Sequence, residues 1–192
     1  MTTFKKALLS FTVACGVAVS AHAAEITECK DCFPDHRMRA IEVKGEIVAG
    51  DAAKFKALIN SMPRDKQIVV GFESSGGLLI EGLQIGDAIH DAGAQTMASF
   101  CDSTCAMAWL AGSTRYIADQ GRVGFHAPIL GAPGEAKNVS GPGAAIMGYY
   151  IARLGLAGNV ALWATEKGSD DLNILTRENA KELGIPTQFL KG

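Results

Sequence analysis

The fold is decided by one stretch, Phe100-Cys101-Asp102-Ser103-Thr104-Cys105-Ala106-Met107-Ala108-Trp109-Leu110-Ala111-Gly112. It places Ser103 where an expected strand ends and an expected helix begins, beside the unpaired N–H groups of a first helical turn. Ser74-Ser75-Gly76-Gly77 precedes it, and Gly124-Phe125-His126-Ala127-Pro128 follows it. A serine at a helix start, a glycine pair and a later histidine are the parts of an acyl-transfer site.

Hydrophobic periodicity around this stretch changes repeatedly between the strand period and the helix period. We expect strands at 39–48, 67–72, 94–100 and 122–125, helices at 51–62, 78–91 and 103–111, and a loop rich in Gly and Pro at 131–143. This order predicts a single α/β domain with a mainly parallel sheet. Such sheets bind ligands beyond the carboxyl ends of their strands, where the segments at 74–77 and 101–105 both fall.

The N-terminal segment has the organisation of a secretory signal peptide. Lys5-Lys6 precede an apolar run at 7–19, and Ala21-His22-Ala23 forms a small-x-small cleavage site before Ala24. We therefore expect residues 1–23 to be removed and the mature protein to be periplasmic or secreted, with no stable membrane span. A lipoprotein acylated at Cys15 is a less favoured alternative.

The mature chain divides into an N-terminal Cys-x-x-Cys segment at 24–38 and a domain at 39–192. Four of the five cysteines follow the cleavage site: Cys29, Cys32, Cys101 and Cys105. In an oxidising compartment they predict two disulfides, with three pairings open. Four thiolates binding zinc are the alternative, but we expect neither a metal site nor a cofactor.

The charge of the chain gives no sign of nucleic-acid binding. Loss of Lys5 and Lys6 with the signal peptide leaves 16 basic and 20 acidic residues, so the formal net charge changes from −2 to −4. No basic cluster is present in the sequence, and such binding depends on one.

Several segments, in this order, resemble the proteolytic subunit of the Clp protease. The likeness covers roughly residues 39–190 and is closer to the periplasmic Clp-protease-like proteins of the Clp/crotonase superfamily, which have a ββα superhelix. It rests on Gly45-Glu46-Ile47, Glu73 to Gly77, Ser103 with Ala111-Gly112, Arg115-Tyr116, Gly124 to Pro128, Leu175-Thr176 through Ala180, Leu183-Gly184-Ile185 and Phe189-Leu190.

The resemblance implies roles for individual residues. Ser103 would be the nucleophile, His126 its general base, and the N–H groups of Gly76 and Thr104 the oxyanion hole. The family's acid aligns with Leu172, so we take Asp171, one residue earlier, as the third member and Asp170 as the reserve. In a strand this slip reverses the side-chain face.

Three functions follow from these residues. The first is an exported serine hydrolase, an ATP-independent peptidase that acts on peptides or proteins through an acyl-enzyme. The second is a non-catalytic binding or scaffolding domain with this fold, which the displaced acid favours. The third, an acyl-CoA enzyme of the crotonase branch, leaves the Ser-His pair without a use.

A simpler interpretation of Ser103 and the question of the oligomeric state remain. Ser103 alone is typical of a helix N-cap. A homo-oligomer is also open, although the segment at 131–168 is shorter than the family's handle helix and gives ring assembly no support.

Overall fold

The computed structural model describes residues 23–33, 37–130, 138–168 and 170–191. Residues 1–22 of the expected signal peptide, including Cys15, lie outside these ranges. The helices are α1 (Asp51–Ser61), α2 (Leu79–Asp91), α3 (Thr104–Leu110), α4 (Gly141–Arg153), α5 (Gly158–Ala164) and α6 (Arg177–Leu183). The strands are β1 (Glu25–Cys29), β2 (Met38–Lys44), β3 (Gln67–Ser74), β4 (Gln95–Asp102), β5 (Arg115–Phe125), β6 (Ile129–Leu130), β7 (Asn138–Val139), β8 (Asn173–Ile174) and β9 (Gln188–Phe189).

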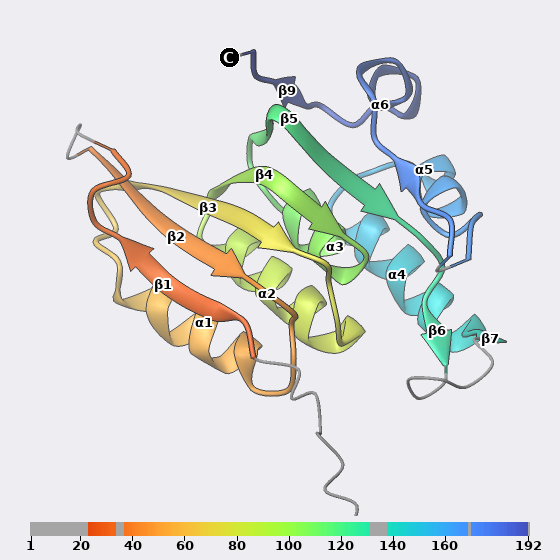
Figure 1. Cartoon of the computed structure of the whole chain (residues 1–192), viewed down its shortest axis with the longest axis horizontal. Coiled ribbons are helices and arrows are strands. Elements are labelled where there is room, and N and C mark those ends of the chain that lie inside the picture. Colours follow the sequence, from red (N-terminus) through yellow and green to blue (C-terminus); the bar gives the residue numbers. More distant parts are fainter. Residues whose placement is uncertain (1–22, 34–36, 131–137, 169, 192) are drawn as a thin grey trace, which may run out of the picture.

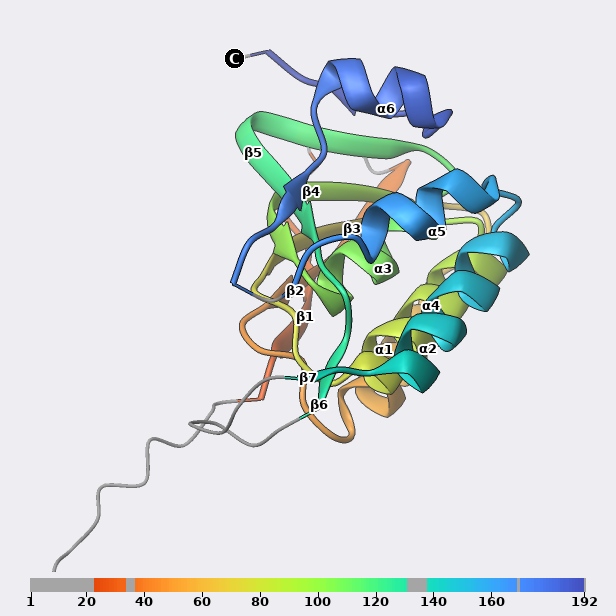
Figure 2. The same ribbon diagram turned by 90° about the vertical axis from the view of Figure 1, so that its right-hand side faces the viewer.

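A mainly parallel sheet forms the centre of the molecule, as the sequence predicts (Figure 1). Its order is β1-β2-β3-β4-β5-β8, with β9 also beside β5. Strands β2 to β5 are parallel to one another, whereas β1 and β8 run antiparallel to their neighbours. Helices α1, α2 and α3 line one side of the sheet, and α4 lies beyond them (Figure 2).

Among the elements that differ from the sequence prediction, three have clear physical reasons. Strand β1 was not expected, because Ile26 is its only large apolar residue; it forms by pairing along the edge of β2. Strand β5 begins seven residues before the expected 122, since its polar middle conceals the strand pattern. Helix α4 begins inside the expected loop, where the Ser140 side chain accepts a hydrogen bond from Gly143 N at 3.0 Å. This cap converts a stretch rich in Gly and Pro into a first helical turn.

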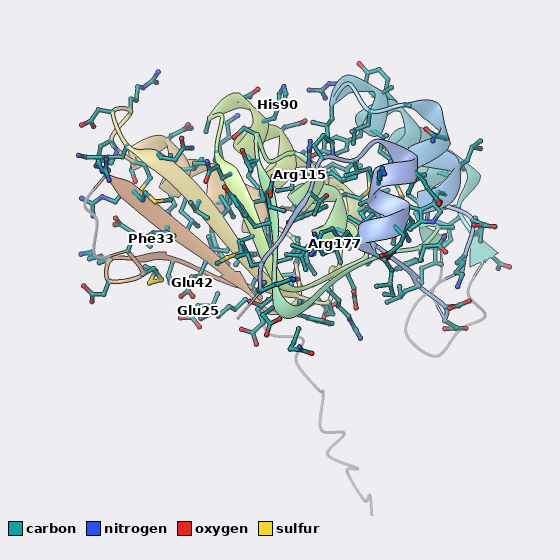
Figure 3. All side chains as sticks on the ribbon, turned by 90° about the horizontal axis from the view of Figure 1, so that it is seen from above. Glu25, Phe33, Glu42, His90, Arg115 and Arg177 are labelled. Carbon is teal, nitrogen blue, oxygen red and sulfur yellow. A yellow bond between two sulfur atoms is a disulfide. The ribbon has the colours of Figure 1, made fainter. Side chains whose placement is uncertain are left out.

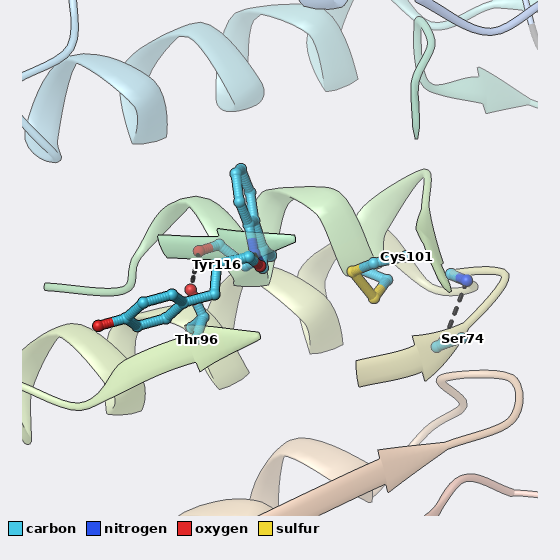
Figure 4. Close-up of a disulfide and its surroundings, with 7 residues drawn as sticks. Ser74, Thr96, Cys101 and Tyr116 are labelled. Carbon is cyan, nitrogen blue, oxygen red and sulfur yellow. Dashed lines mark hydrogen bonds between the residues drawn. A yellow bond between two sulfur atoms is a disulfide. The ribbon is translucent and has the colours of Figure 1, made fainter. Parts of the chain in front are cut away.

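Helix α3 is buried along its whole length and is tied to the sheet at its far end. Trp109, fully buried, donates from Nε1 to the Tyr116 carbonyl at 3.0 Å. Its own carbonyl accepts from Thr96 Oγ1 at 2.8 Å (Figure 4). Buried polar groups need such partners, so these bonds fix the axial position of α3 on β4 and β5.

The register of the sheet brings three strand ends together. Ser74 at the end of β3 is level with Cys101 in β4, and Cys101 is level with Val123 in β5. The residues that directly follow these strands therefore meet at one edge, as expected for parallel strands. In the described ranges, no helix is both long and apolar enough to cross a membrane.

A buried carboxylate anchors the start of α1. Asp51, fully buried, accepts from Ala24 N at 3.1 Å, from Val48 N at 2.9 Å and from Lys54 Nζ at 2.9 Å. Burial acts to raise the Asp51 pKa, but hydrogen bonds from Val48, Lys54 and Ala24 outweigh it and hold the pKa below its usual value.

We expect Asp51→Asn to lower the free energy of unfolding at pH 7 by about 1–3 kcal/mol, because it removes a charged acceptor from three donors. A lowered native pKa means that this stabilisation is complete above the unfolded pKa of about 3.9 and is lost as the pH falls through the native value. Urea unfolding at pH 7 and below pH 4 measures both effects. An equal difference between the two proteins at both pH values would contradict this account.

Candidate active site

Ser103 occupies a strained turn between β4 and α3. Its φ of 60° and ψ of −127° lie in a region that favours glycine. Although Ser103 stands at the N-cap position, its side chain makes no capping hydrogen bond. The interpretation of Ser103 as an ordinary capping serine is therefore wrong. Strain of this kind amounts to about 1–3 kcal/mol and persists only where surrounding structure imposes it.

A disulfide and a backbone hydrogen bond hold this turn. Cys101 and Cys105, both fully buried, are joined with 5.2 Å between their Cα atoms (Figure 4). Ser103 N donates to the Gly124 carbonyl of β5 at 2.8 Å. The disulfide thus spans the turn on both sides of Ser103, and β5 fixes its centre.

The second disulfide joins Cys29 to Cys32, with 5.5 Å between their Cα atoms. The pairing that the sequence left open is therefore local in both cases. All four cysteines are consumed, so the zinc alternative loses its thiolate ligands.

Gly76 lies directly beneath the serine turn. It is buried with a φ of 93°, and an added Cβ would stand 2.7 Å from both Ser103 Cβ and the Asp102 carbonyl oxygen. Its carbonyl accepts from Ile47 N at 2.7 Å, and Leu78 N donates to the Ile47 carbonyl at 2.9 Å. Only glycine permits this close approach of two turns.

The N–H groups near Ser103 differ in availability. Gly76 N donates to Ser74 Oγ at 3.1 Å, so this predicted oxyanion donor already has a partner (Figure 4). Thr104 N–H belongs to the first residue of α3 and has no acceptor within its own helix. Gly77 is exposed and lines the cavity beside Ser103, whereas Gly76 is buried. The sequence did not show which of the two glycines faces the cavity.

Ser103 and His126 line one cavity of about 150 Å³. Apolar side chains complete its wall: Leu78, Leu79, Met107, Pro128, Ile129 and Met147. No hydrogen bond joins Ser103 to His126 within the described part of the chain, and in unliganded sites such bonds are often long. His90, another histidine of the mature chain, is exposed on α2 at the outer edge of the molecule (Figure 3).

The backbone after His126 fixes which ring nitrogen carries the proton. His126 Nδ1 lies 2.6 Å from the Ala127 carbonyl oxygen, which can only accept. Nδ1 must therefore donate, and in the neutral ring Nε2 is left as a proton acceptor. Ala127 is held in turn, because its N–H donates to the Lys167 carbonyl at 2.7 Å.

Asp171 is connected to the His126 loop through Lys167. Its carboxylate is largely exposed and lies 2.8 Å from Lys167 Nζ. Lys167 is also the residue whose carbonyl holds Ala127. Asp171 thus contacts the residue that supports the His126 loop, and its direct role as a third member stays a prediction, as does that of Asp170.

Sequence reasoning missed Asp102, the residue before Ser103. Its side chain is largely buried, with Oδ2 2.7 Å from the Arg122 guanidinium and a buried Oδ1 that has no hydrogen-bond partner. The Arg122 guanidinium carbon also stands 4.6 Å above the Phe100 ring centroid. The sequence signal for Asp102 was a single acidic residue within the otherwise largely apolar stretch at 100–112.

Comparisons with known proteins bear on the fold. No family model and no curated protein matches this chain. Among solved structures, the 1510-N membrane-bound stomatin-specific protease, as a serine-to-alanine mutant, matches with a TM-score of 0.62 and 18% identity over 80% of this chain and 78% of that one. Its lysine-to-alanine mutant in complex with a substrate peptide matches with a TM-score of 0.62 and 19% identity over 80% and 74%.

This chain has a Clp-protease-like fold. At this level of identity the likeness establishes the architecture that the sequence predicted. The chemistry of the site rests on the geometry described above.

The contact between Gly76 and the serine turn yields a stability prediction. Gly76→Ala should lower the free energy of unfolding by about 2–4 kcal/mol, through its positive φ and the overlap with Ser103. Gly50→Ala is the matched control, since Gly50 has the same φ of 93° with nothing within 4 Å of an added Cβ. Urea unfolding that gave equal losses for both variants would contradict the close contact.

The buried disulfide yields a second prediction. Joint replacement of Cys101 and Cys105 by alanine should lower the free energy of unfolding by about 2 kcal/mol through loop closure, with a further loss from the buried sulfur atoms. The Cys29–Cys32 disulfide closes a loop of similar length but has Cys32 exposed, so its joint replacement by alanine is the matched control. Thermal or urea unfolding should therefore show the smaller loss for this control pair, and the reverse order would contradict the account.

Proposed function

We propose that this protein is a serine hydrolase, a peptidase that uses Ser103 and His126 through an acyl-enzyme. The observation that carries the proposal is the uncapped, strained Ser103 sharing a cavity with a histidine whose Nε2 is free to accept a proton. A serine hydroxyl becomes an effective nucleophile only when a neighbouring base accepts its proton.

The reaction would proceed in two stages. His126 Nε2 takes the Ser103 proton as Oγ attacks the scissile carbonyl, and the imidazolium then protonates the leaving amine. The Thr104 N–H at the start of α3, together with an N–H of the Gly76-Gly77 pair, stabilises the oxyanion. Water then attacks the acyl-enzyme by the same route, and no step requires ATP or a cofactor.

The cavity indicates the substrate class. Leu79, Met107 and Met147 give it an apolar wall, and a cavity of this volume holds a group the size of benzene. We therefore propose peptides with an apolar side chain at the residue that supplies the scissile carbonyl. The long, flexible methionine side chains adapt to more than one such side chain.

Export remains part of the proposal. The Ala21-His22-Ala23 motif and the two disulfides support action in an oxidising compartment, periplasmic or extracellular. The alternative is a binding domain of the same fold. It is favoured by the Asp171 carboxylate, which pairs with Lys167 Nζ, while His126 Nδ1 contacts the Ala127 carbonyl.

Labelling with a fluorophosphonate tests the proposal. The mature protein should be modified at Ser103, Ser103→Ala should not react, and His126→Gln should react at least about 100-fold more slowly because the general base is lost. Gel fluorescence and peptide mapping measure the adduct. Absence of labelling under conditions that label a control hydrolase would favour the binding domain.

The role of Asp171 can be tested in the same assay. Because the Ala127 carbonyl orients His126, we expect Asp171→Asn to retain labelling within about tenfold of the wild-type rate. Loss of a directly hydrogen-bonded triad acid lowers the rate by about 10⁴-fold. A drop of that size would show that Asp171 reaches His126 directly and would contradict orientation by the backbone.

A further inference from the structure

The backbone nitrogen of Ala24 lies beside a buried carboxylate that could bind a positive charge. It lies 3.1 Å from Asp51 Oδ2, Ala24 is only 5% exposed, and Asp51 is fully buried. A neutral amide N–H makes one hydrogen bond to this carboxylate. A primary ammonium on the same atom would place a positive charge on the donor side of a contact whose acceptor is already ionised, and so would add an ion pair to the hydrogen bond.

The sequence predicts cleavage at this same nitrogen. Ala21-His22-Ala23 is the small-x-small motif, which places the scissile bond between Ala23 and Ala24. Ala23 is exposed and Ala24 is buried, so the chain enters the protein interior at the bond that is expected to be cut. Since leaders are removed from the chain before it folds, burial of Ala24 in the folded protein does not obstruct the cut.

We propose that removal of the leader creates an α-ammonium group at Ala24 that forms a buried ion pair with Asp51 and completes the mature fold. Hydrolysis consumes one water, breaks the bond between the Ala23 carbonyl carbon and the Ala24 nitrogen, and leaves a carboxylate on Ala23. The Ala24 nitrogen becomes a protonated primary amine. The proposal stands independently of whether Ser103 is a nucleophile.

The surroundings of Asp51 fit this pairing. Lys54 Nζ, which is more than half exposed, pairs with Oδ1, whereas Oδ2 is shared by the N–H groups of Ala24 and Val48. The new charge therefore meets the oxygen that no side-chain cation contacts among the described residues. A buried carboxylate that gains a second positive partner has more of its desolvation offset.

The pairing connects maturation to the candidate active site. Val48, held by Asp51 Oδ2, directly follows Ile47 in the chain. Ile47 clamps the glycine pair through its hydrogen bonds to Gly76 O and from Leu78 N. The mature N-terminus thus stabilises the segment against which Gly76 and Gly77 are positioned.

The cut site is tested first. Protein exported with its own leader should begin at Ala24 by N-terminal sequencing and intact mass. A mature form that begins at another residue would overturn the proposal.

The ion pair is tested by a thermodynamic cycle on chains that begin at Ala24 or at Ala23, each with Asp51 or Asp51→Asn. The Ala24 form should have an unfolding equilibrium constant at least about tenfold smaller than the Ala23 form. In Asp51→Asn the difference should fall below about twofold. Equal stability of the two forms with Asp51 present would overturn the proposal.

A matched control and an independent readout complete the design. Glu81 accepts from Gly50 N and Ala52 N at the same helix start without contacting Ala24, so Glu81→Gln should retain the tenfold difference. In proteins that keep Asp51, acetic anhydride should modify the buried Ala24 amine at least about tenfold more slowly than the exposed Ala23 amine. Equal rates would overturn the proposal even if Asp51→Asn fails to fold.

Discussion

The structure depends on one backbone constraint, the positive φ of Ser103 at the junction of β4 and α3. A non-glycine residue adopts this conformation only when its neighbours impose it. Here the Cys101–Cys105 disulfide spans the turn, and the hydrogen bond to Gly124 ties it to β5. The consequence is a serine side chain that does not cap its helix and is left facing a cavity. In the proposed hydrolase, this strained turn would keep the Ser103 hydroxyl available as a nucleophile.

The parallel sheet brings the other candidate residues of the site to the same edge as Ser103. Three neighbouring strands end level with one another, so the glycine pair, Ser103 and His126 arrive at one edge without long loops. Each is then held by backbone contacts: Gly76 by Ile47, and His126 by the Ala127 carbonyl. In the proposed hydrolase, backbone groups would therefore do much of the positioning that a triad acid performs elsewhere. This explains how Asp171 can lie in an exposed ion pair while the imidazole remains oriented.

Much of this arrangement could be predicted from the sequence, because it rests on local patterns. The period changes around 67–111 predicted β3, α2, β4 and α3, and with them the position of Ser103 at the junction of β4 and α3. The bounds of some elements, and several hydrogen-bond partners, depend instead on tertiary contacts that local sequence patterns do not encode. The length of β5 was hidden by its polar middle, and α4 by glycines whose helix depends on the Ser140 cap. The occupied Gly76 N–H and the Asp51 anchor arise from residues brought together only by folding.

The central claim is that this turn presents Ser103 as a nucleophile opposite His126. A crystal structure of the mature protein after reaction with a peptide boronate tests it most directly. The account predicts a tetrahedral boron bonded to Ser103 Oγ, with one boron oxygen within hydrogen-bond distance of Thr104 N and a glycine N–H of the pair. His126 Nε2 should lie within hydrogen-bond distance of the adduct. A boronate bonded elsewhere, or an empty site at saturating concentration, would contradict the claim.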